Sequence, residues 1–187
     1  MNVEMYERAL KQTGEVVANT QPKQFEDPTV CTEWDVRTLL NHTIGGCTSF
    51  ATGAGGEAIP MDGEDHLQGD HVAAFNGAAK SSLEAFRAPG AMESTFVMPW
   101  GETPGSLAFY LALADATIHG WDLAQATGQH YPIDDDIAEY LLQMTTSMLA
   151  PEGDYPRGEM FKEPVEVAPD AAPGEKLLAY MGRPPRT

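Results

Sequence analysis

Apolar residues recur at intervals of three and four along several segments of the chain, and this spacing constrains the fold more than any other feature. Residues 3–17, 36–50, 72–86 and 137–148 each carry such an apolar stripe, which is typical of an amphipathic helix. A further segment, 104–127, is apolar along most of its length and predicts the longest helix. Because little of the remaining sequence has the pattern of strands, these segments predict an all-α protein built as a helical bundle.

Polar and turn-forming residues mark the ends of these helices. Asp35 and Asp70 can cap the second and third helices, and the acids at 134–136 suit the amino end of the last one. Pro104 is tolerated in the first turn of the long helix, and Gly128 is expected to end it.

Three stretches fall outside these helices. Residues 94–105 predict an extended segment or a short hairpin, and 53–70 form a loop rich in glycine and acid that is expected to be flexible. The proline-rich tail predicts a strand at 163–167 followed by a short helix. No repeat or clean domain boundary is visible, so we expect one domain, with a bundle over 1–150 and an irregular C-terminal extension over 151–187 packed on it.

The chain is strongly acidic, with a formal net charge of −17 and a sequence pI near 4.4. Nucleic acids and anionic membranes bind through Lys and Arg, so neither is expected as a partner. No segment has the apolar length of a membrane span, and the amino terminus lacks the apolar core of a signal peptide. Two cysteines, Cys31 and Cys47, are expected to be small buried residues of a cytoplasmic protein, either a monomer or a homodimer.

An acid and a histidine stand out within the longest predicted helix. Asp115 and His119 are four residues apart, so their side chains share one face and can bind a single ion. Asp122 lies on the same broad face and can accept a hydrogen bond from the second ring nitrogen of His119, as metal-bound imidazoles usually require. The alternative is an ordinary ion pair on a helix.

A third candidate ligand, His42, lies on the flank of the second predicted helix. Gly45 and Gly46 follow it, and each costs a helix about 1 kcal/mol relative to alanine. One explanation is that the glycines clear space beside His42 for a ligand. The other is that they end or kink the helix.

The stretches "CTEWDVRTLLNHTIGG" and "LADATIHGWDLAQATGQ" together resemble the DinB-like superfamily of metal-binding, antiparallel four-helix bundles. They are most similar to the actinobacterial branch that includes mycothiol-dependent maleylpyruvate isomerase, and the "EPVEVAPDAAPGEKLLAYMGRPP" tail resembles small single-domain members of that branch. The resemblance implies a divalent ion, zinc or nickel, held by His42, Asp115 and His119. The isomerase has a glutamate where this chain has Asp115, and it has a second domain for which the residues after 150 are too few.

Two histidines and a carboxylate leave an open position on a tetrahedral ion, as in catalytic zinc sites. The resemblance implies a thiol transferase or isomerase that uses a low-molecular-weight thiol such as mycothiol and an electrophilic small molecule. Alternatives are a metal-dependent hydrolase and a metal-binding or stress-related protein without turnover. If these three residues do not bind metal, His66 and His71 in the acidic loop are the next candidates.

Overall fold

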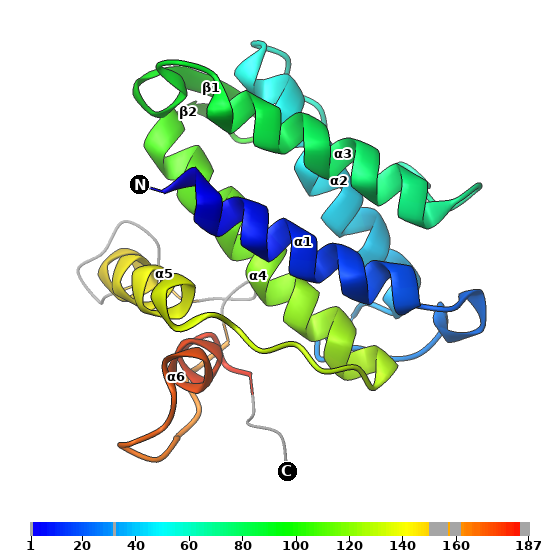
Figure 1. The fold of residues 1–187 in the computed structure, drawn as a ribbon, viewed down its shortest axis with the longest axis vertical. Coiled ribbons are helices and arrows are strands. Elements are labelled where there is room, and N and C mark those ends of the chain that lie inside the picture. Colours follow the sequence, from blue (N-terminus) through cyan, green and yellow to red (C-terminus); the bar gives the residue numbers. More distant parts are fainter. Residues whose placement is uncertain (1, 32, 150–156, 158–161, 184–187) are drawn as a thin grey trace. The chain divides into compact units, whose positions relative to one another are not determined.

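The computed structural model describes residues 2–31, 33–149, 157 and 162–183. It divides the chain into two compact units, 1–131 and 132–187. The first unit contains four long helices and a two-stranded hairpin, and the second contains two helices (Figure 1). The helices are α1 (Val3–Asn19), α2 (Val36–Ala54), α3 (His71–Arg87), α4 (Gly105–Thr127), α5 (Asp135–Met148) and α6 (Pro173–Tyr180), the strands are β1 (Thr95–Met98) and β2 (Gly101–Pro104), and short 3₁₀ turns lie at Pro22–Gln24 and Ala91–Glu93.

The five long predicted helices are confirmed, and so are most of their end signals. The Asp35 carboxylate accepts a hydrogen bond from the backbone N–H of Thr38, and Asp70 caps α3 in the same manner. Gly128 ends α4 in the left-handed conformation, at φ 72°, which glycine adopts without strain. At the start of α5, Asp134 takes the N-cap position, and Asp135 and Asp136 lie in the first turn, as predicted.

The four helices of the first unit, α1 to α4, pack around one core. Helices α1 and α2 each contact both α3 and α4. Phe86 lies near the centre of this core, stacked on Phe96 with ring centroids 5.0 Å apart and edge-on to Tyr6 and Phe109 at 5.6 Å. Helix α4 is buried along most of its length, which explains why its sequence is apolar on several faces.

The hairpin joins α3 to α4 and makes the fold mostly helical rather than wholly so. Strands β1 and β2 pair antiparallel, with Met98 opposite Gly101. The predicted hairpin is therefore confirmed. Phe96 and Met98 point into the core, whereas Trp100 at the turn is 53% exposed.

The acidic loop, expected to be flexible, runs along α2 and is joined to it by hydrogen bonds. The hydroxyl of Ser49 donates to the carbonyl of Ile59, and the side chain of Asn41 accepts from the backbone N–H of His66. Gly45 permits this path, because a Cβ there would lie 1.9 Å from the Met61 carbonyl oxygen. Helix α2 continues through Gly45 and Gly46 to Ala54, so the glycines do not end it.

The second unit contains α5 and α6, which contact each other. The predicted strand at 163–167 is wrong. Pro164 has no N–H to donate, and the N–H of Val165 bonds to the Ala179 carbonyl at the end of α6 rather than to a strand. The predicted division of the domain at residue 150 stays a prediction, because residues 150–156 lie outside the described chain.

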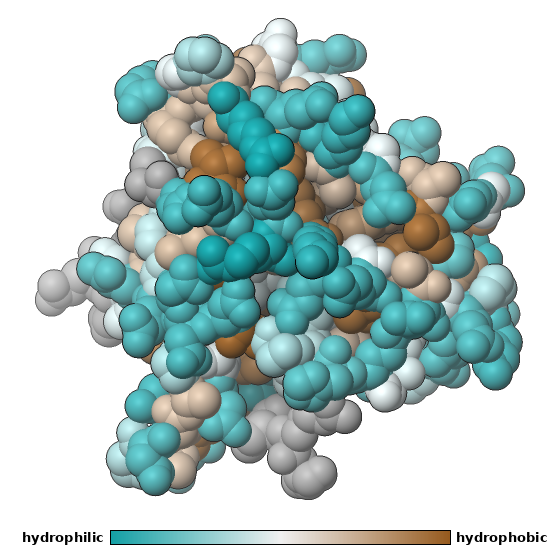
Figure 2. Space-filling view, viewed as in Figure 1, coloured by the Kyte–Doolittle hydropathy of each residue, from teal (hydrophilic) through white to brown (hydrophobic). Residues whose placement is uncertain are grey.

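Hydrophilic side chains cover most of the face shown in Figure 2, consistent with the net charge of −17. Across the described residues, no helix is both long enough and apolar enough to cross a membrane. Even α4, the longest helix, does not qualify.

Candidate functional site

The structure brings His42, Asp115 and His119 together between α2 and α4. The Oδ1 atom of Asp115 lies 3.1 Å from Nε2 of His42 and 3.4 Å from Nε2 of His119. One potential ligand atom from each of the three residues lies within 4.8 Å of the others. The side chains are only 12%, 14% and 16% exposed, so the cluster is sheltered but still open to solvent.

A further carboxylate lies at the Nδ1 atom of each histidine. Nδ1 of His42 lies 2.7 Å from Oδ1 of Asp62, and Nδ1 of His119 lies 3.3 Å from Oδ2 of Asp122. When Nδ1 carries the proton and donates it to a carboxylate, Nε2 is left with its lone pair. Both lone pairs then point toward Asp115, which is the carboxylate–histidine arrangement that orients imidazoles in metal centres.

Electrostatics couple the three groups. Burial lowers the pKa of His42, but Asp115 and Asp62 outweigh it and raise this pKa to about 9. Burial raises the pKa of Asp115, whereas His119 and His42 together lower it below its ordinary value. Without an ion, Asp115 is therefore a carboxylate and His42 is protonated at neutral pH. A divalent cation would take the place of that proton.

Gly46 makes room for Asp115 on the α2 side. A Cβ at this position would lie 2.9 Å from Oδ2 of Asp115 and 3.0 Å from Cε of Met61. The space expected beside His42 is thus used by the carboxylate from α4 and by the acidic loop. Behind it, burial raises the pKa of the Cys47 thiol to about 12, with a further contribution from Asp115, so Cys47 is not a nucleophile at neutral pH.

The turn that precedes α2 lies against the two histidines. The Trp34 ring centroid is 4.6 Å from that of His42 and 5.7 Å from that of His119. The turn is tied by hydrogen bonds from the Thr29 hydroxyl to the carbonyls of Cys31 and Trp34. It also places the Cys31 thiol 3.5 Å from Oδ2 of Asp122, so Cys31 is not the deeply buried residue that was expected.

Sequence reasoning missed Asp62 and Cys31 as neighbours of the site, and it favoured a core position over a pocket-lining one for Trp34. Asp62 is one of several acids in a loop with no periodicity, and only the path of that loop along α2 selects it. Trp34 and Cys31 precede α2, so no helical spacing relates them to His42. The "CTEWD" motif that contains both was the available signal.

The next candidates, His66 and His71, make other contacts. The Nε2–H of His71 donates to the Thr20 carbonyl, 3.2 Å away, and its ring packs edge-on against Phe25. In the part of the chain that the structure describes, no group of three potential metal ligands includes either histidine.

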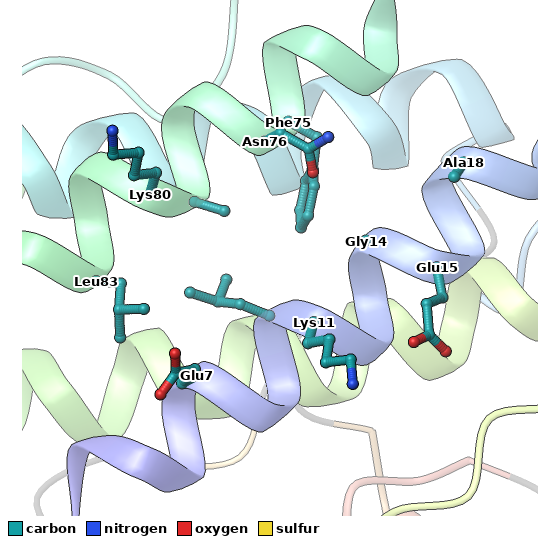
Figure 3. A pocket seen from close by; sticks show the side chains of 11 residues that line it. Glu7, Lys11, Gly14, Glu15, Ala18, Phe75, Asn76, Lys80 and Leu83 are labelled. Atoms are coloured by element: carbon teal, nitrogen blue, oxygen red, sulfur yellow. The ribbon is translucent and has the colours of Figure 1, made fainter.

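A surface groove of about 450 Å³ lies elsewhere, between α1 and α3 (Figure 3). Phe75 points into it, and Lys11, Glu15 and Lys80 lie at its sides. None of the three candidate ligands lines it. The groove is therefore separate from the polar cluster between α2 and α4.

Comparison with known proteins places the chain in a family. The profile of the mycothiol maleylpyruvate isomerase N-terminal domain matches residues 6–124, which include all of α2 and most of α4. The chain belongs to this family. The relationship predicted from the two helix motifs is therefore confirmed.

Two curated proteins match over nearly the whole chain. Two Mycobacterium tuberculosis proteins, the uncharacterized proteins Rv0738 and MT0763, are each 33% identical over 178 residues, which is 95% of this chain and 95% of theirs. The similarity therefore extends beyond the matched domain into the second unit.

Solved structures agree with the family assignment in fold. The crystal structure of the mycothiol-dependent maleylpyruvate isomerase is similar with a TM-score of 0.56 at 14% identity, covering 78% of this chain and 68% of that one. A histidine-to-alanine mutant of that enzyme gives a TM-score of 0.53 at 13% identity, with the same coverage. At 13–14% identity, these matches show that the chain shares the fold of the isomerase, and they show no more than the fold.

Proposed function

We propose that this family member is a divalent-metal-binding protein in which His42, Asp115 and His119 hold the ion. In this proposal, α1 to α4 form a DinB-like antiparallel four-helix bundle around the site. The observation that carries the proposal is that both Nδ1 atoms face carboxylates while both Nε2 atoms face the same oxygen of Asp115.

The spacing of the ligand atoms suits a tetrahedral ion. Zinc bonded to nitrogen and oxygen at about 2.0–2.2 Å holds two such ligands about 3.3–3.5 Å apart. The two N···O distances at Asp115, 3.1 and 3.4 Å, are close to this. Zinc is the first candidate and nickel the second, because imidazole and carboxylate ligands suit both.

Three protein ligands leave a position for a small molecule, and we propose a low-molecular-weight thiol such as mycothiol. A bound divalent ion supplies Lewis acidity, which favours the thiolate form of such a thiol. Asp62 and Asp122 would keep the two imidazoles oriented, and the Trp34 ring would wall one side of the site. Because the pKa of Cys47 is raised to about 12, Cys47 would not be the nucleophile, and the proposal assigns that role to the external thiol.

The reaction would be thiol transfer to an electrophile, or thiol addition and elimination with isomerisation. The family name, which refers to a mycothiol-dependent isomerase, supports this class over hydrolysis by a metal-bound water. A protein that binds the ion without turnover would keep the same ligand set but would have no affinity for the thiol.

Thermal melting of the zinc-loaded protein with mycothiol or its S-methyl derivative tests the proposal. A ligand of the folded state raises the melting temperature by mass action. The free thiol is expected to raise it and the S-methyl form is not, and only when zinc is present. Equal shifts for both forms would show that the sulfur does not reach the ion, and no shift with either would favour the non-catalytic alternative.

A further inference from the structure

A second group of potential metal ligands shares His119 with the first. It consists of Cys31, Asp122 and His119, whose ligand atoms all lie within 4.8 Å of one another. We infer that this group is a second coordination position, selective for thiophilic divalent ions such as cadmium, and that it competes with the first position for His119. The inference rests on the proposed function only in that both positions use this imidazole.

The distances suit an ion bound by sulfur, nitrogen and oxygen. With the bond lengths of zinc, about 2.3 Å to sulfur and 2.0–2.2 Å to nitrogen and oxygen, a tetrahedral ion separates sulfur from oxygen by about 3.6 Å and nitrogen from oxygen by about 3.4 Å, and a larger ion such as cadmium requires slightly wider spacings. The Cys31 Sγ lies 3.5 Å from Oδ2 of Asp122, and Nδ1 of His119 lies 3.3 Å from the same oxygen. Asp122 is fully buried, so its carboxylate is held in place.

The turn that carries Cys31 is fixed on both sides. The Thr29 hydroxyl accepts from the Cys31 backbone N–H and donates to its carbonyl, and the N–H of Trp34 donates to the same carbonyl. Pro28 and Asp35 form an isolated bridge that closes the turn just before α2. Hydrogen bonds on both of its backbone groups therefore hold Cys31 in place, as a metal ligand requires.

A neutral imidazole has a single lone pair, so the two positions exclude each other. With an ion on Nε2, the Nδ1–H of His119 donates to Asp122. With an ion on Nδ1, the Nε2–H donates to Asp115, 3.4 Å away. Whichever ring nitrogen of His119 keeps its N–H, a carboxylate is therefore in place to accept a hydrogen bond from it.

The identity of the ion decides between the positions. Soft thiolate ligands favour thiophilic ions, whereas the imidazole and carboxylate set lacks sulfur. When a thiophilic ion binds, the Cys31 thiol loses its proton to solvent, and its covalent S–H bond is replaced by a sulfur–metal bond. Neither the sulfur nor the ion changes oxidation state. Such an ion would draw His119 away from the first position and release the ion held there.

Titration of the reduced, metal-free protein with cadmium tests this inference through the ultraviolet thiolate-to-cadmium charge-transfer band. The chain has only Cys31 and Cys47, so each can be removed in turn. We expect the band to saturate at one equivalent in the wild type, to persist in Cys47→Ser and to be lost in Cys31→Ser. His42→Ala, which removes only a ligand of the first position, should keep the band, and circular dichroism checks that each variant is folded.

Competition is measured on the zinc-loaded protein. One equivalent of cadmium is expected to release zinc from the wild type but not from Cys31→Ser, whose zinc content should be normal. A missing band in the wild type at saturating cadmium, or a band that survives in Cys31→Ser, would overturn the second position and leave the first untouched. Loss of zinc from Cys31→Ser would instead overturn the first position, because zinc would then depend on the thiol.

Discussion

Gly46→Ala tests whether Asp115 serves as a ligand, without altering any ligand. The added methyl group would lie 2.9 Å from Oδ2 of Asp115 and 3.0 Å from Cε of Met61. The methionine tip can move away because the Met61 side chain is long and flexible. The carboxylate is held by His42 and His119 through its other oxygen and must be displaced or rotated.

The magnitude follows from the distances. Restoring an ordinary van der Waals contact of about 3.4 Å moves the carboxylate by about 0.5 Å, and metal ligands tolerate about 0.2 Å. Disturbing the support of a metal ligand typically costs on the order of 10–100-fold in affinity, and we expect a loss in this range. Helix propensity favours alanine by about 1 kcal/mol, so the metal-free protein should stay folded.

Competition with a chromogenic chelator measures the zinc affinity of wild type, Gly46→Ala and a matched control. In Gly53→Ala, on the same helix, the methyl group would lie 2.9 Å from Sδ of Met98 and 3.0 Å from the Val97 carbonyl oxygen. The control suffers a similar clash away from the site and should bind zinc normally. Equal affinities for all three proteins would refute the argument that Asp115 holds the ion from this position.

Four further outcomes are expected. Asp62→Asn should leave the fold intact, because this side chain is 65% exposed. It should weaken zinc binding about 10–100-fold in the same chelator assay. The neighbouring variant Glu64→Gln should have no effect on zinc binding. Because the pKa of His42 is raised to about 9, zinc must displace its proton at pH 7, and the affinity measured by calorimetry should rise up to about tenfold per pH unit until about pH 9. Because the pKa of His42 is raised, its protonation stabilises the metal-free protein, by the full amount below the ordinary pKa of 6.5. The melting temperature should therefore fall as the pH rises through 9. A flat profile would contradict the pairing with Asp115. Asp35→Ala should lower stability to denaturant by about 1 kcal/mol through the lost cap of α2 while leaving the zinc stoichiometry unchanged.

Local signals in the sequence were enough to predict the helices. The caps at Asp35 and Asp70 and the stop at Gly128 depend on neighbouring residues, and each acts where it was expected. The strand predicted at 163–167 failed because a strand requires a partner, and local pattern alone does not supply one.

The candidate site divides in the same way. Asp115 and His119 are related by helical spacing, so their proximity follows from the sequence. His42 is 73 residues from Asp115 and meets it only because α2 packs on α4. Asp62 and Cys31 lie in irregular segments, whose paths are set by hydrogen bonds between side-chain hydroxyls and the backbone and by the absence of a side chain at Gly45.

The central claim, an ion held by His42, Asp115 and His119, is tested most directly by anomalous diffraction from crystals of the zinc-loaded protein. Data collected on both sides of the zinc absorption edge should give one strong difference peak, at about 2.0–2.2 Å from Nε2 of both histidines and from Oδ1 of Asp115. A peak bonded to other residues, or no peak in crystals soaked with excess zinc, would contradict the account.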